Sequence, residues 1–503
     1  MELQLRTVPE HPDNVTDEHQ TGYRLAELLG EGGQGAVFRT AEHGAAIKLI
    51  YQDEPQAAAS LQARLDQMRS RPLWNSPISR PFAVLQPGGQ GTSSYNGYVM
   101  DLRDGAIPIS RLIGSENEWD DVGQLIHWYN VTTGGLRRRL VLLAAAAETL
   151  AWLRAIPFVY ADPSPNNILV SKHLNEEDVW LIDPDNIGLR RRGSAEPGVG
   201  TQQALTVYTP GYAAPEIVNE RSFATTLSDA FSFAVIAYEV LTLRHPFVGD
   251  VIEKGPPELV AEAYAGKWPW IEHPTDQRNA CQQGLRPTSL MLNAGLRALA
   301  REAFEQGRDD PMARPGMGRW ADQLRRAADM TLPCRQCSAT SYPFTGEPQP
   351  RAACRWCGAP RDGFALMRVE TWIGPFEPAP GLKPWPGGMV PGQASHGFGL
   401  VPPGGLRITR RHAYPGTIRN RHQPLLEVRH IGDGLELLPQ RGETGLAPGE
   451  LWLELQPGER RQVTGTTRVP WRPTDQGMTI GPLHFGPPDR THRVVLFVDY
   501  PGP

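Results

Sequence analysis

The spacing of hydrophobic positions predicts that the chain changes character along its length. Up to about residue 330, strand-like runs alternate with long helix-like stretches, as at Ala45–Ile50, Tyr98–Leu102, Val179–Ile182, Arg137–Ala155 and Leu227–Leu243. From Leu406 onward the pattern changes to short alternating runs between Pro and Gly turns, at 425–430, 450–455 and 494–500. We therefore expect an α+β body followed by a small all-β module.

Composition narrows the class of protein. A chain of 503 residues at ~100–200 residues per domain predicts two to four domains. A net charge of -5 provides no general attraction for nucleic acid or for anionic lipid, so we expect neither as a partner. The chain has no 18-residue apolar run, its start lacks the pattern of a secretion signal, and its five cysteines are too few for a disulfide scaffold. These features predict a cytoplasmic protein without a membrane span.

Proline and glycine are concentrated in one segment. Residues 374–405 hold 8 Pro and 9 Gly in 32 positions, a composition that buries too little apolar surface to offset the entropy of ordering it. We expect a linker over 361–405.

A glycine-rich run near the start carries the first chemical signal. Gly30-Glu31-Gly32-Gly33-Gln34-Gly35-Ala36-Val37 has the spacing G-x-G-x-x-G-x-V, and Lys48 ends a strand-like A-A-I-K thirteen residues after the last glycine. Alone, the glycines also fit a dinucleotide-binding turn or a plain tight loop. However, the residues after Gly35 predict a second strand and not a helix, which favours a hairpin that covers phosphates with Lys48 beside them.

A second signal follows the helix-like stretch at Arg137–Ala155. Asp162 and Asn167 stand in D-x-x-x-x-N within Tyr160–Val170, and a strand-like run ends in Leu181-Ile182-Asp183-Pro184-Asp185. Carboxylate and amide oxygens are ligands that Mg²⁺ prefers, and a carboxylate can accept the proton of an attacking hydroxyl. Without the flanking motifs, Asp162 and Asn167 could equally be turn-forming residues.

Together these motifs resemble the protein-kinase superfamily, and further motifs extend the resemblance over about residues 23–328. Gly211–Glu216 matches the A-P-E segment, Ser228–Thr242 resembles the long buried helix of the C-lobe, and Asp310–Pro315 resembles D-P-x-x-R-P. The resemblance implies a bilobal fold and pairing of Arg314 with Glu216. Small-molecule kinases generally lack these last three motifs, so it also implies a protein substrate.

The resemblance further implies the roles of individual residues. Asp162 would accept the substrate proton, with Lys48 and Asn167 completing the catalytic set, while Asn167 and Asp183 would hold Mg²⁺. The residues that it implies for ATP binding are Gly30, Gly32, Gly35, Val37, Lys48, Met100 and Leu102.

Several positions depart from the kinase pattern. Tyr160 and Ala161 replace His and Arg of H-R-D, so the arginine that would receive a phosphate on Ser194, Thr201, Thr206 or Thr209 is absent. Ser164 replaces the usual Lys, Pro184 and Asp185 replace Phe and Gly of D-F-G, and Gln62 stands where the family has the Glu that pairs with the Lys. These departures keep a second interpretation open, a pseudokinase that binds nucleotide and acts as a scaffold. The run Arg137–Arg139 is most simply a solvated helix start.

Four cysteines form two C-x-x-C pairs. Cys334 and Cys337 are followed after sixteen residues by Cys354 and Cys357, which fits the spacing of a zinc ribbon. Four thiolates satisfy tetrahedral Zn²⁺ and leave no open position, so the site would be structural. The alternative is a set of unrelated thiols or a redox pair.

The order of these parts resembles a subgroup of bacterial Hanks-type Ser/Thr kinases, those of the tellurium-resistance-associated phosphorylation triad. That resemblance implies a cognate phosphatase and a von Willebrand A-type protein as partners. We expect an N-terminal extension at 1–22, a catalytic domain at 23–328, a ribbon at 332–360, the linker at 361–405 and the β module at 406–503.

Overall fold

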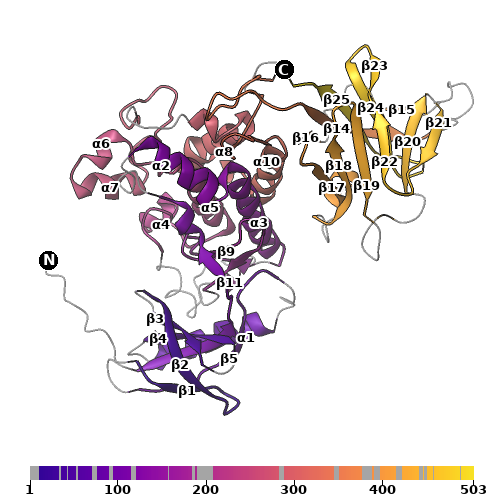
Figure 1. The fold of residues 1–503 in the computed structure, drawn as a ribbon. Coiled ribbons are helices and arrows are strands. Elements are labelled where there is room, and N and C mark those ends of the chain that lie inside the picture. The colour runs from indigo at the N-terminus through magenta and orange to yellow at the C-terminus, as the bar shows by residue number, and fades with distance from the viewer. Residues whose placement is uncertain are drawn as a thin grey trace, which may run out of the picture. The chain divides into compact units, whose positions relative to one another are not determined.

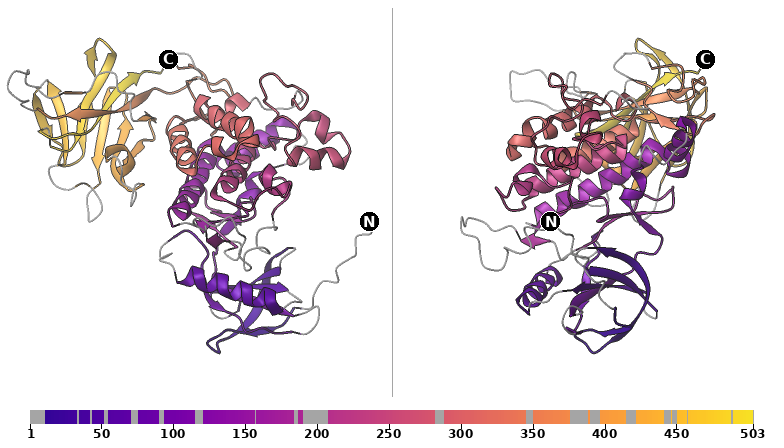
Figure 2. Two further views of the ribbon diagram at one scale, coloured as in Figure 1. Left: turned by 180° about the vertical axis from the view of Figure 1, so that it is seen from behind. Right: turned by 90° about the vertical axis from the view of Figure 1, so that its left-hand side faces the viewer.

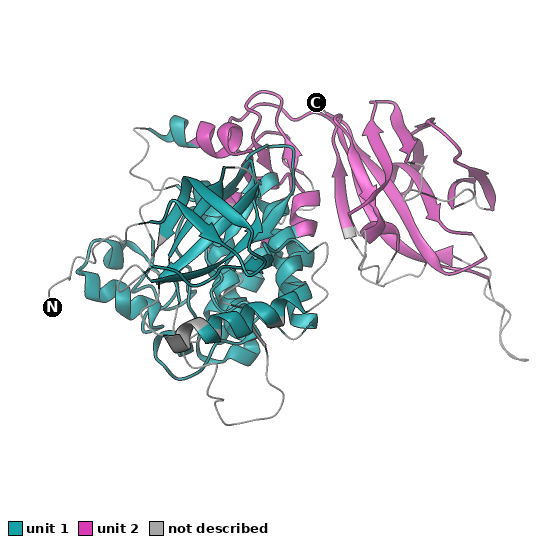
Figure 3. Cartoon of the chain, turned by 90° about the horizontal axis from the view of Figure 1, so that it is seen from below, with its two compact units in different colours: residues 1–125, 138–288, 295–324 teal, residues 126–137, 289–294, 325–503 magenta. Residues whose placement is uncertain are grey.

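The computed structural model divides the chain into two compact units. It describes residues 11–32, 35–41, 44–51, 55–70, 76–89, 94–114, 121–156, 158–183, 187–189, 208–281, 288–344, 350–375, 388–389, 397–414, 422–440, 446, 450–456, 458–487 and 489–502. Unit 1 comprises residues 1–125, 138–288 and 295–324, and unit 2 comprises residues 126–137, 289–294 and 325–503 (Figure 3). No helix within the described residues is long and apolar enough to cross a membrane.

Unit 1 begins with an antiparallel six-stranded sheet and one helix that packs against it (Figures 1 and 2). In spatial order the strands are β1 (Asn14–Thr16), β2 (Gly22–Gly32), β3 (Gly35–Thr40), β4 (Ala45–Tyr51), β6 (Tyr95–Asp101) and β5 (Pro81–Val84), and the helix is α1 (Pro55–Arg69). Alternate residues of β4 enter different cores, because side chains along a strand point to opposite faces. Ile47 and Leu49 belong to one cluster, whereas Ala46 and Ile50 pack with Leu61 and Leu65 of α1.

The expected N-terminal extension is partly wrong. Residues 14–16 form the edge strand β1, which pairs with Gly22–Arg24 of β2. Asp17 then accepts hydrogen bonds from the backbone N–H of Thr21 (2.9 Å) and the hydroxyl of Tyr23 (3.0 Å), which holds the turn between the strands. The sheet therefore starts at residue 14, because a short strand is enough to cover its edge.

The rest of unit 1 is mainly helical. The helices between 121 and 329 are α2 (Val122–His127), α3 (Gly135–Ala155), α4 (Pro215–Val218), α5 (Thr226–Thr242), α6 (Asp250–Glu253), α7 (Pro257–Tyr264), α8 (Ala294–Phe304), α9 (Gln306–Asp309) and α10 (Met317–Asp329). Short strands accompany them: β7 (Ala106–Pro108), β9 (Ile168–Ser171) and β10 (Val179–Leu181) form one sheet, and β8 (Phe158–Val159) pairs with β11 (Gly188–Leu189). Most of α5 is buried, as its apolar sequence predicts, and Thr225 caps it with a reciprocal capping box.

The arginines at the start of α3 are not solvated, contrary to our expectation. Arg139 is fully buried and donates to the carbonyl oxygens of Val240 (3.1 Å) and Leu112 (3.1 Å). Arg138 is also buried and donates to the carbonyl oxygen of Ser171 (2.6 Å). A guanidinium carries five N–H donors in a fixed fork, which suits it to bind several backbone carbonyls inside a protein.

Unit 2 contains the cysteine segment and a two-sheet β-sandwich. The cysteine segment includes β12 (Leu332–Pro333) and β13 (Thr340–Ser341). One sheet of the sandwich runs β15 (Gly388–Met389), β14 (Phe364–Ile373), β25 (His492–Tyr500), β24 (Gly477–Phe485), β20 (Leu451–Gln456), β21 (Glu459–Gln462), with β16 (Gly397–Val401) on β14 and β23 (Arg472–Thr474) on β24. The other runs β17 (Leu406–Thr409), β18 (Pro424–His430), β19 (Gly434–Pro439), β22 (Thr467–Pro470). Leucine and valine side chains from both sheets form a common core.

The prediction of a linker over 361–405 is wrong for the residues of this range that the structure describes. β14 pairs with the last strand, β25, over nine consecutive positions from Phe364 to Trp372, and β16 lies along its other edge. The run Phe364–Ile373 lies outside the proline-rich tract, and its side chains alternate between buried and partly buried. The sandwich therefore begins near residue 364, not at 406. The second half also contains a one-turn helix, α11 (Arg410–Ala413), where the sequence predicted only strands.

Candidate active site

The glycine-rich run forms a hairpin, as predicted. β2 and β3 pair Gly30 with Val37 and Gly32 with Gly35, while Gly33 and Gln34 lie outside the described residues. Gly35 has a φ of +153°, and a Cβ there would lie only 1.8 Å from the carbonyl oxygen of Leu49. No larger residue fits this position without moving β4.

Three of the side chains predicted to bind ATP lie in one apolar cluster. Met100 is buried with Ala46, and Val37 and Leu102 pack against the same group of residues. Val37 and Leu102 are the partly buried members of this cluster, and Val37 is paired with Lys48 across β3 and β4. A flat heteroaromatic base suits apolar side chains of this kind.

Lys48 contacts the acid predicted to hold a metal. Its Nζ lies 3.0 Å from Oδ1 of Asp183, and the Lys48 side chain is almost fully buried. Asp183 follows β10 and has a φ of +59°, which turns the backbone sharply at the end of the strand. The two residues are 135 positions apart in the chain, and the fold brings them together.

Asp162 is held by the amide of Asn167 and by Thr209, which lies just before the A-P-E segment. Nδ2 of Asn167 donates to the backbone carbonyl of Asp162 at 3.0 Å and lies 3.4 Å from its carboxylate. Thr209 donates twice to that carboxylate, through its backbone N–H at 2.9 Å and its hydroxyl at 3.1 Å. Burial raises the pKa of Asp162, and the bonds from Thr209 and Asn167 oppose that rise.

Asp229 fixes the backbone that precedes Asp162. Its carboxylate accepts the N–H of Tyr160 at 2.9 Å and that of Ala161 at 3.0 Å. Ala161 has a φ of +74°, an unusual value for a residue other than glycine, and these two bonds hold it. Burial raises the pKa of Asp229 to about 7. The Tyr160 hydroxyl donates to the carbonyl oxygens of Asn167 (3.2 Å) and Ile182, so it links the catalytic loop to the segment between β10 and Asp183.

The roles of Thr209 and Asp229 do not follow from the sequence pattern. From the sequence, Thr209 is a candidate phosphate acceptor and Asp229 is part of a buried helix. One signal was available for Asp229, since an acid in an otherwise apolar helix requires hydrogen-bond donors in its neighbourhood. Thr209 carries no such signal, because a threonine in a loop is compatible with many environments.

The predicted pairing of Arg314 with Glu216 is confirmed. Both terminal nitrogens of the guanidinium lie 2.7 Å from the carboxylate oxygens, in the bidentate arrangement typical of strong pairs. Arg314 also donates to the carbonyl oxygen of Leu227 at 3.0 Å, and its guanidinium lies 5.0 Å from the ring centre of Phe231. The pair ties the A-P-E segment to the start of α5.

The helix α1 carries no glutamate, and Gln62 is bonded within its own helix. Its amide donates to both carboxylate oxygens of Asp66 at 3.2 Å. The departures at Pro184 and Asp185 lie outside the described residues, as do Ser194, Thr201 and Thr206. Ser164 is buried in the catalytic loop.

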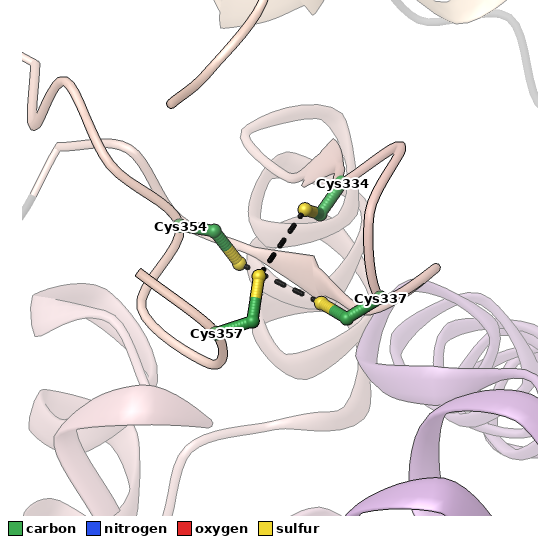
Figure 4. A group of neighbouring side chains, drawn as sticks. All are labelled: Cys334, Cys337, Cys354 and Cys357. Atoms are coloured by element: carbon green, nitrogen blue, oxygen red, sulfur yellow. Dashed lines mark hydrogen bonds between the residues drawn. The ribbon is translucent and has the colours of Figure 1, made fainter. Parts of the chain in front are cut away.

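The four predicted cysteines gather in unit 2, and their sulfurs point toward one another (Figure 4). All four lie within 4.8 Å of one another, with Cys334–Cys357 at 3.7 Å and Cys337–Cys354 at 3.8 Å. A tetrahedral ion with bonds of ~2.3 Å to sulfur places its ligands roughly 3.8 Å apart. The cluster thus has the size that Zn²⁺ requires.

The backbone around the two cysteine pairs follows the same pattern. In each, the residue after the second cysteine has a positive φ, 58° at Ser338 and 74° at Gly358. Their N–H groups donate to the carbonyls of Cys334 (2.9 Å) and Cys354 (3.0 Å). Burial opposes ionisation of the Cys334 thiol, but backbone N–H groups of Cys337 and Gln336, together with the neighbouring thiols, outweigh it and lower its pKa to about 7. Burial raises the pKa of the Cys337 and Cys354 thiols, so ionisation of these two is opposed in the absence of a cation.

Comparison with known proteins agrees with the geometry of unit 1. Residues 136–277 match the family model of the protein kinase domain. Residues 136–277 are thus similar to a protein kinase domain. The matched residues include α3, the catalytic loop and α5, whereas the glycine-rich sheet precedes them.

Bacterial kinases are among the relatives of the chain. It is 25% identical over 238 residues to the serine/threonine-protein kinase PknA of Mycobacterium tuberculosis, which covers 45% of this chain and 48% of PknA. It is 28% identical over 237 residues to pkn2 of Myxococcus xanthus (46% and 25%). It is 27% identical over 232 residues to the DNA damage-responsive kinase RqkA of Deinococcus radiodurans (45% and 31%). The chain spans half or less of the length of these relatives.

Proposed function

We propose that the protein is an ATP- and Mg²⁺-dependent Ser/Thr protein kinase. The observation that carries the proposal is the convergence of Lys48, Asp183, Asp162 and Asn167, four residues from three segments of unit 1. Phosphoryl transfer depends mainly on positioning and on charge neutralisation, and these residue types provide both. The Ser/Thr kinases among the relatives support the choice of acceptor.

Asp162 would orient the substrate hydroxyl and accept its proton. Burial raises the pKa of its carboxyl, which makes it a better acceptor than an exposed aspartate. Asp229 and Thr209 keep the carboxylate in place, and the enclosing residues limit access by water. Lys48 would place a cation on the phosphates, while the apolar cluster at Val37 and Met100 would hold the base.

The residues at the metal positions fit Mg²⁺. Asn167 uses its amide nitrogen toward Asp162, so its amide oxygen is the atom that remains for a cation. Asp183 adds a carboxylate, and both are hard oxygen ligands. When bound, the ion would neutralise charge that develops on the phosphates.

A pseudokinase scaffold remains the second candidate, and Gln62 is the observation that favours it. In active kinases the lysine pairs with a glutamate of a helix, and the D-F-G aspartate holds Mg²⁺. Here Lys48 contacts Asp183, while the amide of Gln62 donates to Asp66. An active enzyme with this arrangement would turn over slowly.

The partners follow from the same proposal. A protein kinase acts on protein Ser or Thr residues, and the resemblance to the tellurium-resistance-associated triad adds a cognate phosphatase and a von Willebrand A-type protein. Co-purification of either with the full chain would test that part separately.

The experiment is transfer from [γ-³²P]ATP with MgCl₂, for wild type, Asp162→Asn and Lys48→Met, together with nucleotide binding measured by thermal shift. A kinase shows label in wild type and none in either variant. Binding of nucleotide without transfer would support the scaffold. Absence of both binding and transfer would contradict both candidates.

A further inference from the structure

The helix α3 follows a glycine. It starts at Gly135, and the residue before it, Gly134, has no side chain that could accept a hydrogen bond. The first N–H groups of a helix lack partners within the helix and need acceptors from elsewhere. At the third position, Arg137, the N–H donates to Oγ1 of Thr340 at 3.1 Å. This is the geometry of an N-cap, provided by a residue 203 positions away.

Thr340 is held by contacts with both C-x-x-C turns of the cysteine segment. Thr340 lies three residues after Cys337, in β13. Its carbonyl oxygen accepts the indole N–H of Trp356 at 3.2 Å, and Trp356 lies between Cys354 and Cys357. The Trp356 ring also packs on Tyr129, with ring centres 5.9 Å apart. An ion shared by the two cysteine pairs would therefore hold Thr340 in place.

On the α3 side of this contact, Gly135 leaves space for the Thr340 hydroxyl. Gly135 has a φ of +73°, and a Cβ there would lie 3.3 Å from Oγ1 of Thr340. Such a distance is tighter than most Cβ contacts, so a larger residue would push against the threonine. Glycine at this position gives the cap its room.

The residues that follow Arg137 in α3 continue toward the catalytic loop. Arg138 binds the carbonyl of Ser171, which ends the strand that follows Asn167. Arg139 binds the carbonyl of Val240 in α5, the helix whose Asp229 holds the backbone before Asp162. The last turn of α3 is followed directly by β8 and the catalytic loop.

We propose that Thr340 is a positioning residue: its hydroxyl caps α3, so that metal binding at the four cysteines stabilises the start of the helix that carries Arg138 and Arg139. The effect on catalysis rests on the proposed kinase function, whereas the coupling between metal and helix does not.

The test uses the full chain loaded with Zn²⁺ and five forms of it. Thr340→Val removes the hydroxyl at nearly constant volume, and Thr340→Ser retains it. Thr467→Val is the matched control, because the Thr467 hydroxyl donates to a nearby carbonyl within the sandwich. Wild type treated with a chelator is the fourth form, and chelated Thr340→Val is the fifth. Hydrogen exchange is followed by mass spectrometry on peptides that span 133–141, and kcat and KM for ATP are measured in parallel.

Loss of a cap corresponds to roughly 2- to 30-fold faster exchange in the first turn of α3. We expect this faster exchange in Thr340→Val and in chelated wild type. Chelation of Thr340→Val should give no further increase in exchange. Thr340→Ser and Thr467→Val should exchange like wild type. In the kinase assay, Thr340→Val should lower kcat and leave KM for ATP unchanged.

Unchanged exchange in either Thr340→Val or chelated wild type would overturn the proposal, as would failure of the serine variant to restore protection. If the valine variant does not fold, the chelated wild type and its recovery on return of Zn²⁺ still decide the question. If wild type transfers no phosphate, the kinase function fails while the exchange data still test the cap.

Discussion

Arg314 and Glu216 are 98 residues apart in the chain and form a bidentate ion pair with two contacts of 2.7 Å. The Arg314 side chain is fully buried, so its charge depends on this partner. A buried guanidinium that loses its carboxylate keeps the cost of desolvation without the compensating attraction.

We expect Glu216→Gln to lower the free energy of unfolding of the kinase domain by about 3–5 kcal/mol. The control is Glu302→Gln, because Glu302 forms a bidentate pair with Arg319 on the surface, and exposed pairs contribute ~1 kcal/mol or less. Urea unfolding monitored by tryptophan fluorescence compares the two. Equal losses of unfolding free energy in the two variants would show that burial does not make the Arg314–Glu216 ion pair more stabilising than an exposed pair.

Asp183→Asn should abolish phosphoryl transfer, because it removes both a metal-ligand charge and the anionic partner of Lys48. The matched control is Asp178→Asn, which changes an exposed acid a few residues upstream. Transfer from labelled ATP is the measurement. Wild-type rates in Asp183→Asn would remove this residue from the site and make Asp185 the candidate ligand.

Phosphorylation of the loop before A-P-E should not activate the enzyme, since Ala161 offers no cation to a phosphate. Thr209 is already bonded to Asp162, so a phosphate there would place negative charge beside a carboxylate. We expect phosphatase treatment to leave activity unchanged, Thr209→Ser to remain active and Thr209→Glu to be inactive. A large loss of activity after phosphatase treatment would contradict this prediction.

One Zn²⁺ per chain is expected at Cys334, Cys337, Cys354 and Cys357. Thiolate-bound Zn²⁺ contributes folding energy on the order of 10 kcal/mol in small zinc peptides. Removal should unfold the cysteine segment while nucleotide binding, which involves residues of the first sheet, persists. Elemental analysis of protein purified under reducing conditions without chelator measures the ion, with Cys281→Ser as the control, and a value near zero would exclude the site.

His245 should make the kinase domain less stable in acid. Burial lowers its pKa to about 4, and its Nε2 lies 2.8 Å from the carbonyl oxygen of Gly211. Because the folded pKa is below the unfolded value of about 6.5, the unfolded state takes up a proton first as pH falls from 6.5 toward 4, and stability is lost in that window. At pH 5 the loss is roughly 2 kcal/mol.

Asp229 acts in the opposite direction, since its raised pKa of about 7 reduces stability as pH rises from about 4 to 7. The informative quantity is therefore the difference between wild type and His245→Asn. Urea unfolding at pH 7.5 and pH 5 should show a smaller loss in the variant. An identical pH dependence in both proteins would show that His245 does not contribute.

The candidate functional residues that could be predicted from the sequence are those that stand in motifs with a characteristic spacing. Lys48, Asp162 and the four cysteines could be identified because their chemistry tolerates few substitutes, and Arg314 followed from the kinase resemblance. Arg138 and Arg139 were misread, because a basic run at a helix start is usually exposed and only the packing around it reveals backbone carbonyls within reach. The strand β14 was missed because the proline and glycine of its neighbours dominated the composition of the wider segment. Which strand pairs with which depends on tertiary contacts that local composition does not encode.

The pairing of β14 with β25 has a consequence for the order in which the protein forms. β14 is the first strand of the sandwich to be synthesised, but one of its two long neighbours is β25, the last strand of the sandwich in sequence order. The residues of unit 1 precede β14 and can fold during synthesis, since domains generally fold as units from the N-terminal side. The sandwich cannot close until β25 has been synthesised, so β14 keeps an open edge through the synthesis of nearly every other strand of its module. During that interval the edge of β14 is the segment most exposed to wrong pairing with another nascent chain.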